Sequence, residues 1–210
     1  MKSDLKNHWN TVYGNKSEAE LSWHQEDAGV SLEMFDAAGI ATGGSAIDIG
    51  GGRSRLAGAL LRRGVRDVTV LDLSEVALNA SRAQAVPEGD AVTWVTADIT
   101  TWEPRRQYDL WHDRAVFHFL VTQADRAGYL DRLTRAIAMD GHAMIATFAP
   151  DGPETCSGLP VQRYGPDELS AVLGGGFTRI ADRAEVHVTP WGSAQSFQFC
   201  LFRKISEPKQ

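Results

Sequence analysis

Short apolar runs alternate with amphipathic stretches along most of the chain. Apolar runs that predict buried strands occupy residues 45–50, 68–74, 91–100, 108–113 and 142–150. Between them, apolar residues spaced three and four positions apart predict helices over residues 53–64, 75–86 and 123–141. Strands that alternate with helices are typical of βαβ units, which build a parallel sheet with right-handed crossovers. The pattern therefore predicts an α/β fold.

The two ends of the chain depart from this alternation. Residues 5–38 are predicted to be helical and are rich in aromatic and polar side chains. Near the C-terminus, a short helix at 167–173 precedes two strands, 177–188 and 196–204, with no helix between them. These strands should pair antiparallel at one edge of the sheet. The loop at 151–166 is rich in glycine and proline, and its length indicates a function.

Composition places the chain among ordinary globular proteins. It has 210 residues, 43% hydrophobic and 23% charged, so one domain with a sizeable core is the simplest organisation. The net charge of −6 argues against a nucleic-acid partner. Cys156 and Cys200 are the only cysteines and lack the spacing of metal ligands, so no metal is predicted. No apolar stretch approaches the roughly 20 residues of a membrane helix, and no secretion signal is recognisable, so we expect a cytoplasmic protein that binds no membrane.

Three glycines, Gly50–Gly52, directly follow the first predicted strand. In an open α/β sheet, ligands bind beyond the carboxyl ends of the strands, and glycines there let the backbone approach a ligand closely. A turn that only packs strand against helix is the alternative. The dinucleotide pattern G-x-G-x-x-G is absent, because Arg55 occupies its third glycine position. Asp48, two residues before the first glycine, would repel a pyrophosphate and attract an ammonium group. The pattern favours an amino-acid-bearing nucleoside without phosphates.

Acidic residues end the next predicted strands as well. Asp72 ends the second strand about 20 residues beyond the glycines, where an acid can accept hydrogen bonds from both ribose hydroxyls. Asp98 ends the third strand, where its side chain can hydrogen-bond an adenine amino group, and Asp113 ends the fourth. A single acid of this kind is commonly a cap or a turn residue. Together with Asp48, however, four acids in register predict a shared binding crevice.

These motifs resemble those of the class I S-adenosylmethionine (SAM)-dependent methyltransferases. The resemblance rests on AIDIGGGRS, LDLS, TADIT and YDLWHDRAVFHFL, in that order, and covers nearly the whole chain. It implies a Rossmann-like α/β fold, with seven mostly parallel strands, helices on both faces and an antiparallel last strand. It also implies SAM as the cofactor. The contacts that it implies are the methionine part at Asp48, Gly50 and Gly52, the ribose at Asp72, the adenine at Leu73, Asp98 and Ile99, and the sulfonium end near Asp113.

The N-terminal stretch HWNTVYGNKSEAELSWHQ resembles the lid of small-molecule methyltransferases of the thiopurine type. It also resembles bacterial relatives of the citrate synthase lysine methyltransferase, as do CSGLPVQRY and TPWGSAQSFQFCLF. In such lids an aromatic side chain covers the cofactor, which makes Trp9, Tyr13 and Trp23 candidates; hydrophobic anchoring of the helix is the alternative. We therefore expect one methyltransferase domain, with a lid at 1–40, a catalytic α/β core at 41–205 and a tail at 206–210.

Candidate catalytic residues lie at and after the fourth strand. An acceptor that must lose a proton would need a general base, and the candidates are His112, Asp113 and His118, with His187 as a further possibility. Strand alternation puts His112 and Asp113 on opposite faces, so only one of them can point at the methyl group. Candidate substrate-binding residues come from the long loop and the last strands: Cys156, Arg163, His187 and Trp191. Arg163 would pair with an anionic substrate, and a plain surface charge is its alternative.

The sequence thus predicts a SAM-dependent methyltransferase that acts on a small-molecule nucleophile: a thiol, an amine, a hydroxyl or a metalloid anion. A protein lysine N-methyltransferase, with a protein as substrate, is the main alternative. A non-catalytic cofactor-binding module and an NAD-dependent oxidoreductase are less favoured, the latter because of Asp48 and the missing third glycine. Methyltransferases of nucleobases carry N/D-P-P-Y/F after the fourth strand, whereas this chain has DRAVF, which argues against a nucleic-acid substrate.

Overall fold

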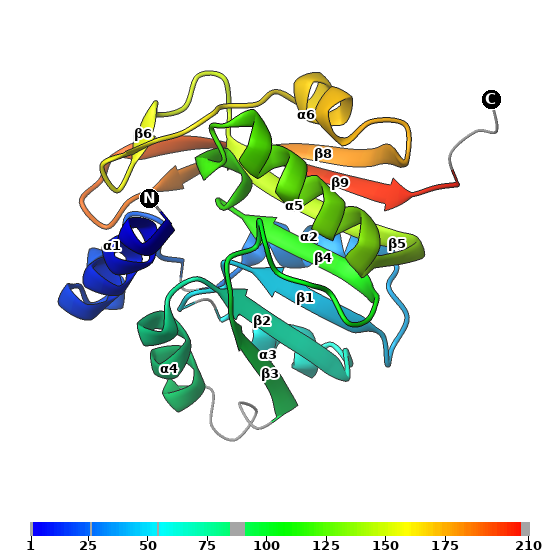
Figure 1. Ribbon diagram of the computed structural model, residues 1–210, viewed down its shortest axis with the longest axis horizontal. Helices are drawn as coiled ribbons and strands as arrows, with labels where there is room; N and C mark the ends of the chain where they lie inside the picture. The colour runs from blue at the N-terminus through cyan, green and yellow to red at the C-terminus, as the bar shows by residue number, and fades with distance from the viewer. Residues whose placement is uncertain (1, 26, 54, 85–90, 207–210) are drawn as a thin grey trace.

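A seven-stranded sheet forms the centre of the computed structural model, which describes residues 2–25, 27–53, 55–84 and 91–206 (Figure 1). The strand order within these residues is β3-β2-β1-β4-β5-β9-β8. The strands are β1 (Ser45–Ile49), β2 (Asp67–Asp72), β3 (Val92–Thr96), β4 (Tyr108–Arg114), β5 (Ile137–Phe148), β8 (Phe177–Val188) and β9 (Ala194–Lys204). The first five pair in parallel, and β9 runs antiparallel to both of its neighbours, β5 and β8. The predicted α/β fold with an antiparallel last strand is confirmed.

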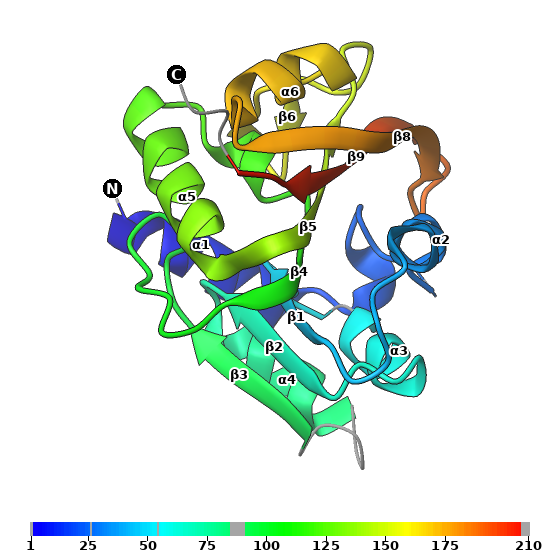
Figure 2. The same ribbon diagram turned by 90° about the vertical axis from the view of Figure 1, so that its right-hand side faces the viewer.

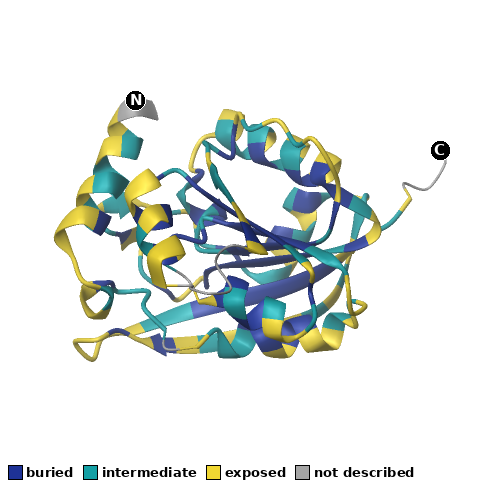
Figure 3. Ribbon diagram, turned by 90° about the horizontal axis from the view of Figure 1, so that it is seen from below, coloured by how far each residue is buried: buried dark blue, intermediate teal, exposed yellow. Residues whose placement is uncertain are grey.

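Helices cover both faces of this sheet because each strand alternates its side chains between two hydrophobic cores. In β1, Ala46 belongs to one core and Ile47 and Ile49 to the other. The helices are α1 (Lys2–Asn15), α2 (Gly29–Ala38), α3 (Leu56–Arg62), α4 (Glu75–Gln84), α5 (Gln123–Ala136) and α6 (Pro166–Leu173). Helices α2, α3 and α4 pack on the first core, and α5 and α6 on the second. Figure 2 shows α5 on one side of the strands and α2 and α3 on the other. Figure 3 shows the buried strands between helices whose outer faces are exposed.

The helix predicted over 123–141 is too long, because α5 ends at Ala136 and β5 begins at once with Ile137. Ile137 is fully buried and pairs with Tyr108 of β4, so strand pairing and burial override the local helical pattern. Gly141 therefore lies inside a strand instead of ending a helix.

The N-terminal segment is also less regular than predicted. Helix α1 ends at Asn15, a short 3-10 helix η1 (Glu18–Glu20) follows, and α2 starts only at Gly29. Ser17 explains the break, because its backbone N–H and its hydroxyl both donate to the Glu20 carboxylate, at 2.9 and 2.6 Å. The division into lid, core and tail stays a prediction. Position 54, positions 85–86 and most of the predicted tail, 207–210, lie outside the described residues.

The long loop contains a small hairpin, formed by β6 (Thr155–Cys156) and β7 (Leu159–Pro160). Ser157 and Gly158 make its turn with φ values of 50° and 76°. None of the helices in the described part of the chain combines the length and apolar character that a membrane crossing requires.

We expect Gly128→Ala to destabilise the fold, although alanine normally stabilises a helix interior by about 0.5–1 kcal/mol relative to glycine. A Cβ atom at Gly128 in α5 would lie 2.6 Å from the backbone oxygen of Thr100. The expected loss is about 1–3 kcal/mol of unfolding free energy, measured by urea unfolding. Gly14→Ala in α1 is the matched control, because nothing lies within 4 Å of its added methyl group. A variant at 128 as stable as the control would contradict this contact.

Candidate functional site

A cavity of about 380 Å³ lies at the carboxyl ends of the strands. Its size falls within the roughly 300–1,000 Å³ typical of small-molecule sites. The residues that line it from the strand ends include Ile49, Gly50, Asp72, Leu73, Asp98, Ile99, Arg114 and Val116. The N-terminal segment contributes Leu5, Trp9, Tyr13 and Trp23, and the C-terminal half contributes Phe148, Cys156, Gln195 and Phe197. Segments far apart in the sequence therefore line one cavity.

The turn at Gly50–Gly52 needs glycine for its backbone and for close packing. Gly50 and Gly52 have φ values of 64° and 47°, in the left-handed region that favours glycine. A Cβ atom at Gly50 would overlap the side chain of Val116, and one at Gly52 would lie 2.5 Å from the Tyr13 hydroxyl. Protein side chains approach the turn closely, so tight packing, the alternative to ligand binding, explains part of the need for glycine here.

Asp48 lies behind this turn and pairs with His112. The strand register places the two residues opposite each other on β1 and β4. Asp48 Oδ1 lies 2.7 Å from His112 Nδ1, and His112 Nε2 lies 2.9 Å from the Ser31 hydroxyl. The second carboxylate oxygen of Asp48, Oδ2, is buried and has no hydrogen-bond partner among the described residues. Asp48 and His112 line a smaller cavity of about 80 Å³ together with Gly50 and Gly51.

Asp72 is held rigidly at the end of β2. Its Oδ2 accepts a hydrogen bond from the Gly52 N–H at 2.9 Å, and its Oδ1 accepts one from the Ser74 N–H at 2.7 Å. Burial raises the pKa of Asp72 to about 6. The carboxylate links the glycine turn to the start of α4, and it lines the larger cavity next to Leu73.

Asp98 and Ile99 follow β3 and face the same cavity. Asp98 Oδ1 accepts hydrogen bonds from the Thr100 N–H and hydroxyl, at 2.8 and 2.7 Å. This local turn fixes the direction of the carboxylate. The structure thus brings Gly50, Asp72, Leu73, Asp98 and Ile99 together, as the motif pattern predicts.

The three aromatic residues of the predicted lid meet over the cavity. The rings of Trp9 and Tyr13 lie edge-on to Trp23, with centroids 5.8 and 6.0 Å away. Arg53, next to the glycine turn, donates to the backbone oxygens of Tyr13 and Lys16 at 2.6 and 3.0 Å. These bonds hold α1 against the cavity.

Asp113 lines neither of the two cavities, and its predicted roles in catalysis and cofactor binding stay predictions. Because strand side chains alternate, Asp113 points to the α5 side, opposite to His112. It is fully buried, and it accepts hydrogen bonds from the Tyr129 hydroxyl at 2.6 Å and from the backbone N–H groups of Val116 and Phe117. Burial raises its pKa to about 6. Asp113 therefore holds β4 to α5 and to the following turn.

The two candidate histidines near β4 are also engaged in the structure. His118 is fully buried in the 3-10 helix η3 (Phe117–Phe119), where Nδ1 accepts a hydrogen bond from the Phe148 N–H at 3.4 Å. Burial, with a contribution from Arg114, lowers the pKa of His118 to about 3, so it stays neutral. His112 uses both ring nitrogens on Asp48 and Ser31. Neither residue lines the larger cavity, although His112 lines the smaller one, and their assignment as catalytic bases stays a prediction.

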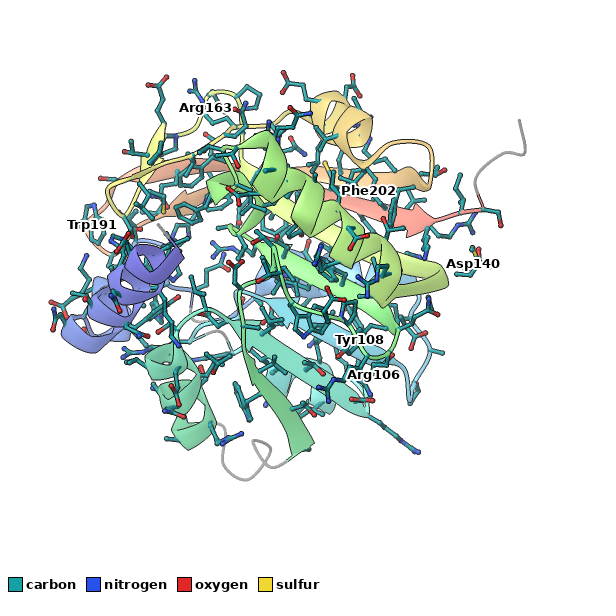
Figure 4. All side chains as sticks on the ribbon, viewed as in Figure 1. Arg106, Tyr108, Asp140, Arg163, Trp191 and Phe202 are labelled. Carbon is teal, nitrogen blue, oxygen red and sulfur yellow. The ribbon has the colours of Figure 1, made fainter. Side chains whose placement is uncertain are left out.

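Of the predicted substrate residues, only Cys156 lines the larger cavity. Burial raises its thiol pKa to about 11, so the thiol stays protonated at neutral pH. Arg163 instead braces its own loop through the Gly152 backbone oxygen and the Glu154 carboxylate. His187 contacts the Ser22 backbone oxygen at 2.7 Å, and Trp191 is 59% exposed in the β8–β9 turn. Figure 4 shows Arg163 and Trp191 at the periphery of the molecule. None of these three residues lines either cavity, and their assignment to the substrate stays a prediction.

Sequence reasoning missed Arg114, the last residue of β4, which lines both cavities. Its guanidinium lies 4.8 Å from the centroid of the Phe197 ring, and Nη1 donates to the Trp23 backbone oxygen at 3.0 Å. Burial lowers its pKa to about 10, so it is charged at neutral pH. The available signal was a basic residue directly after Asp113, at the predicted end of the fourth strand.

Comparison with protein families identifies the central part of the chain. Residues 46–141, from β1 into β5, match the family model described as a methyltransferase domain. No curated protein matches the chain.

Solved structures share the fold over nearly the whole chain. One is the 1,6-didemethyltoxoflavin-N1-methyltransferase of Burkholderia thailandensis, with bound 1,6-didemethyltoxoflavin and S-adenosylhomocysteine (SAH). It is 22% identical, with 98% of this chain and 87% of that chain covered and a TM-score of 0.72. Another is the N-methyltransferase NodS of Bradyrhizobium japonicum WM9 with SAH, 13% identical, with 96% and 99% covered and a TM-score of 0.73. The chain shares its fold with these methyltransferases, and residues 46–141 match a methyltransferase domain; membership of the class I SAM-dependent family and of its thiopurine-type branch stays a prediction.

We expect Asp113→Asn to flatten the pH dependence of stability between about pH 4 and 6. Burial raises the folded-state pKa of Asp113 to about 6, above the value of about 3.9 in an unfolded chain, so the folded state binds the proton more tightly. The contribution of this carboxyl group to the unfolding free energy is therefore fully present below about pH 4. It is lost as the pH rises through about 6, by on the order of 2–3 kcal/mol.

Urea unfolding of both proteins from pH 4 to pH 7 measures this effect. Asp72, whose pKa is also raised to about 6, is common to both proteins, so their difference isolates Asp113. Equal slopes in the two proteins would show that Asp113 has no raised pKa.

Proposed function

We propose that this chain is a class I SAM-dependent methyltransferase that transfers the methyl group to a small-molecule nucleophile. One observation carries the proposal: the cavity at the carboxyl edge of the sheet gathers the glycine turn, Asp72 and Asp98 under an aromatic cover. The match of residues 46–141 to a methyltransferase domain and the shared fold support it independently.

The residues present suit SAM better than a dinucleotide. The buried and unpartnered Oδ2 of Asp48 offers an acceptor for the ammonium group of the methionine part. Asp72 would take the ribose hydroxyls, and Asp98 and Ile99 the adenine edge, as in other nucleotide sites at strand ends. The two arginines after the turn also line the smaller cavity, but both are engaged by the protein: Arg53 binds backbone oxygens of the α1 end, and Arg55 binds Glu18. The buried carboxylates of Asp48 and Asp72 beside the glycine turn disfavour a pyrophosphate.

SAM supplies an activated methyl group on its sulfonium sulfur when it is bound. The chain's own contribution is to orient the two reactants and to keep water out, which by positioning alone can lower a barrier by roughly 7–11 kcal/mol. Among the described residues that line the larger cavity there is no histidine, and the Cys156 thiol is protonated. We therefore propose an acceptor that is nucleophilic without help from such a base, for example a thiolate or an uncharged amine.

A small-molecule acceptor also suits the shape of the site. The lid aromatics cover one side, and Cys156 of the β6–β7 hairpin and Gln195 of β9 line the other. One neighbour of the same fold is described as a methyltransferase of 1,6-didemethyltoxoflavin, which is a precedent for a small acceptor on this scaffold.

Calorimetric titration with SAM, SAH and NADH tests the cofactor. We expect SAM and SAH to bind and NADH not to bind, and the reverse order would overturn the proposal. SAH release with a panel of thiols, amines and oxyanions then tests turnover. Turnover of a protein lysine alone would favour the lysine methyltransferase, and binding without any turnover would favour a cofactor-binding module.

We expect Asp72→Asn to weaken SAM binding by about 10- to 100-fold, because it removes charged hydrogen-bond acceptors worth about 1.5–3 kcal/mol. The matched control is Asp109→Asn at the opposite end of β4, where the Asp109 carboxylate holds Ser45 N–H at 2.8 Å. The control should change stability and leave SAM affinity intact. Unchanged SAM affinity in Asp72→Asn would argue that the ribose lies elsewhere.

We expect Asp48→Asn to weaken binding of SAH more than that of 5′-methylthioadenosine, which lacks the amino-acid part. Asp48 is assigned to the ammonium group, whereas Asp98 is assigned to adenine, so Asp98→Asn should weaken both ligands. Calorimetry on wild type, Asp48→Asn and Asp98→Asn gives the loss of affinity of each variant for SAH and for 5′-methylthioadenosine. Equal losses for both ligands in Asp48→Asn would show that Asp48 does not contact the amino-acid part.

A further inference from the structure

Arg114 is a buried cation at the junction of the two cavities. It is the last residue of β4, and its side chain follows His112 on the same side of the strand. Its guanidinium lies over the Phe197 ring, and Nη1 is bonded to the backbone oxygen of Trp23. The two remaining nitrogens, Nε and Nη2, are buried and have no hydrogen-bond partner among the described residues.

Such an arrangement is unfavourable for the protein alone. A buried charged group is normally paired, and each buried donor left without an acceptor costs about 1–3 kcal/mol. The nearest compensation is the charge of Glu185 on β8, which acts on Arg114 without forming an ion pair with it in the described part of the chain. Glu185 Oε1 accepts from the Gln25 side chain at 3.1 Å, and its Oε2 is buried without a hydrogen-bond partner among the described residues. One edge of the Arg114 guanidinium therefore has no bonded anion.

The edge that lacks a partner has a defined shape. Nε and Nη2 point in the same direction, and this edge of a guanidinium binds the two oxygens of a carboxylate side by side. The cavity around it is mostly apolar, and Trp23, Phe119, Phe148 and Phe197 contribute aromatic rings to its lining. Asp72 and Asp98, assigned to the cofactor, line the same cavity from the ends of β2 and β3. The surroundings of Arg114 thus combine a cation with an apolar wall.

We propose that Arg114 binds the carboxylate of the methyl acceptor, and that the acceptor is a small aromatic or otherwise apolar acid. This inference rests on the proposed function, because it assigns the acceptor end of the same cavity. It replaces Arg163, the residue that the sequence suggested for an anionic substrate. A purely structural Arg114 would only hold the N-terminal segment through Trp23.

Calorimetric titration of the SAH-loaded protein with benzoate and with benzamide tests the inference. The two probes have the same shape, and only benzoate carries a carboxylate. We expect wild type to prefer benzoate, and Arg114→Gln to lose about 10- to 100-fold in benzoate affinity with little change for benzamide. Arg114→Lys keeps the charge and loses the planar fork, so it should retain part of the preference.

Arg163→Gln is the matched control, because it removes a guanidinium that faces away from the cavity, and it should bind benzoate as wild type does. Thermal unfolding of each variant reports on folding, and SAH binding reports on the proposed function separately. If wild type binds SAH but binds benzoate and benzamide equally well, or binds neither of them, the inference is overturned. The proposed function is unaffected by that result. Tighter binding of phenylphosphonate than of benzoate would also overturn it. Loss of SAH binding in wild type would count against the proposed function itself.

Discussion

The backbone turn at Gly50–Gly52 is the constraint on which the site depends. The Gly50 N–H donates to the Leu71 oxygen, and the Gly52 N–H donates to the Asp72 carboxylate, so the turn ties β1 to the end of β2. Val116 packs against Gly50, and the Tyr13 hydroxyl lies against Gly52. Because side chains are absent from this turn, three strand ends and the N-terminal helix can meet around one cavity.

The side chains of β4 alternate between the two faces of the sheet, and each face has different contacts. His112 and Arg114 point to the side of the small cavity, where they contact Asp48 and the backbone of Trp23. Asp113 points to the other side and joins the Tyr129 hydroxyl in the core. One face of β4 therefore lines the small cavity, and the other holds the sheet to α5.

Three side chains from other parts of the fold bind backbone oxygens of the N-terminal segment. Arg53 binds the Tyr13 and Lys16 oxygens, His187 contacts the Ser22 oxygen and Arg114 binds the Trp23 oxygen. These three side chains come from the glycine turn, β8 and β4. The segment that carries the aromatic cover is thus tied to the glycine turn, to β4 and to β8.

The sequence by itself determined the alternation of strands and helices, the antiparallel last strand and the positions of Asp48, Asp72 and Asp98 at strand ends. The strands and helices follow from the local periodicity of apolar residues. The acids could be placed together because the carboxyl ends of parallel strands share one edge of a sheet. Only the tertiary structure decided that Asp113 and His118 are buried away from the cavity and that Arg114 lines it. It also decided that α5 ends at Ala136, where Ile137 pairs with β4. Side-chain direction and element ends depend on partners remote in the chain, such as Tyr129, Phe197 and Trp23, and no local pattern encodes those contacts.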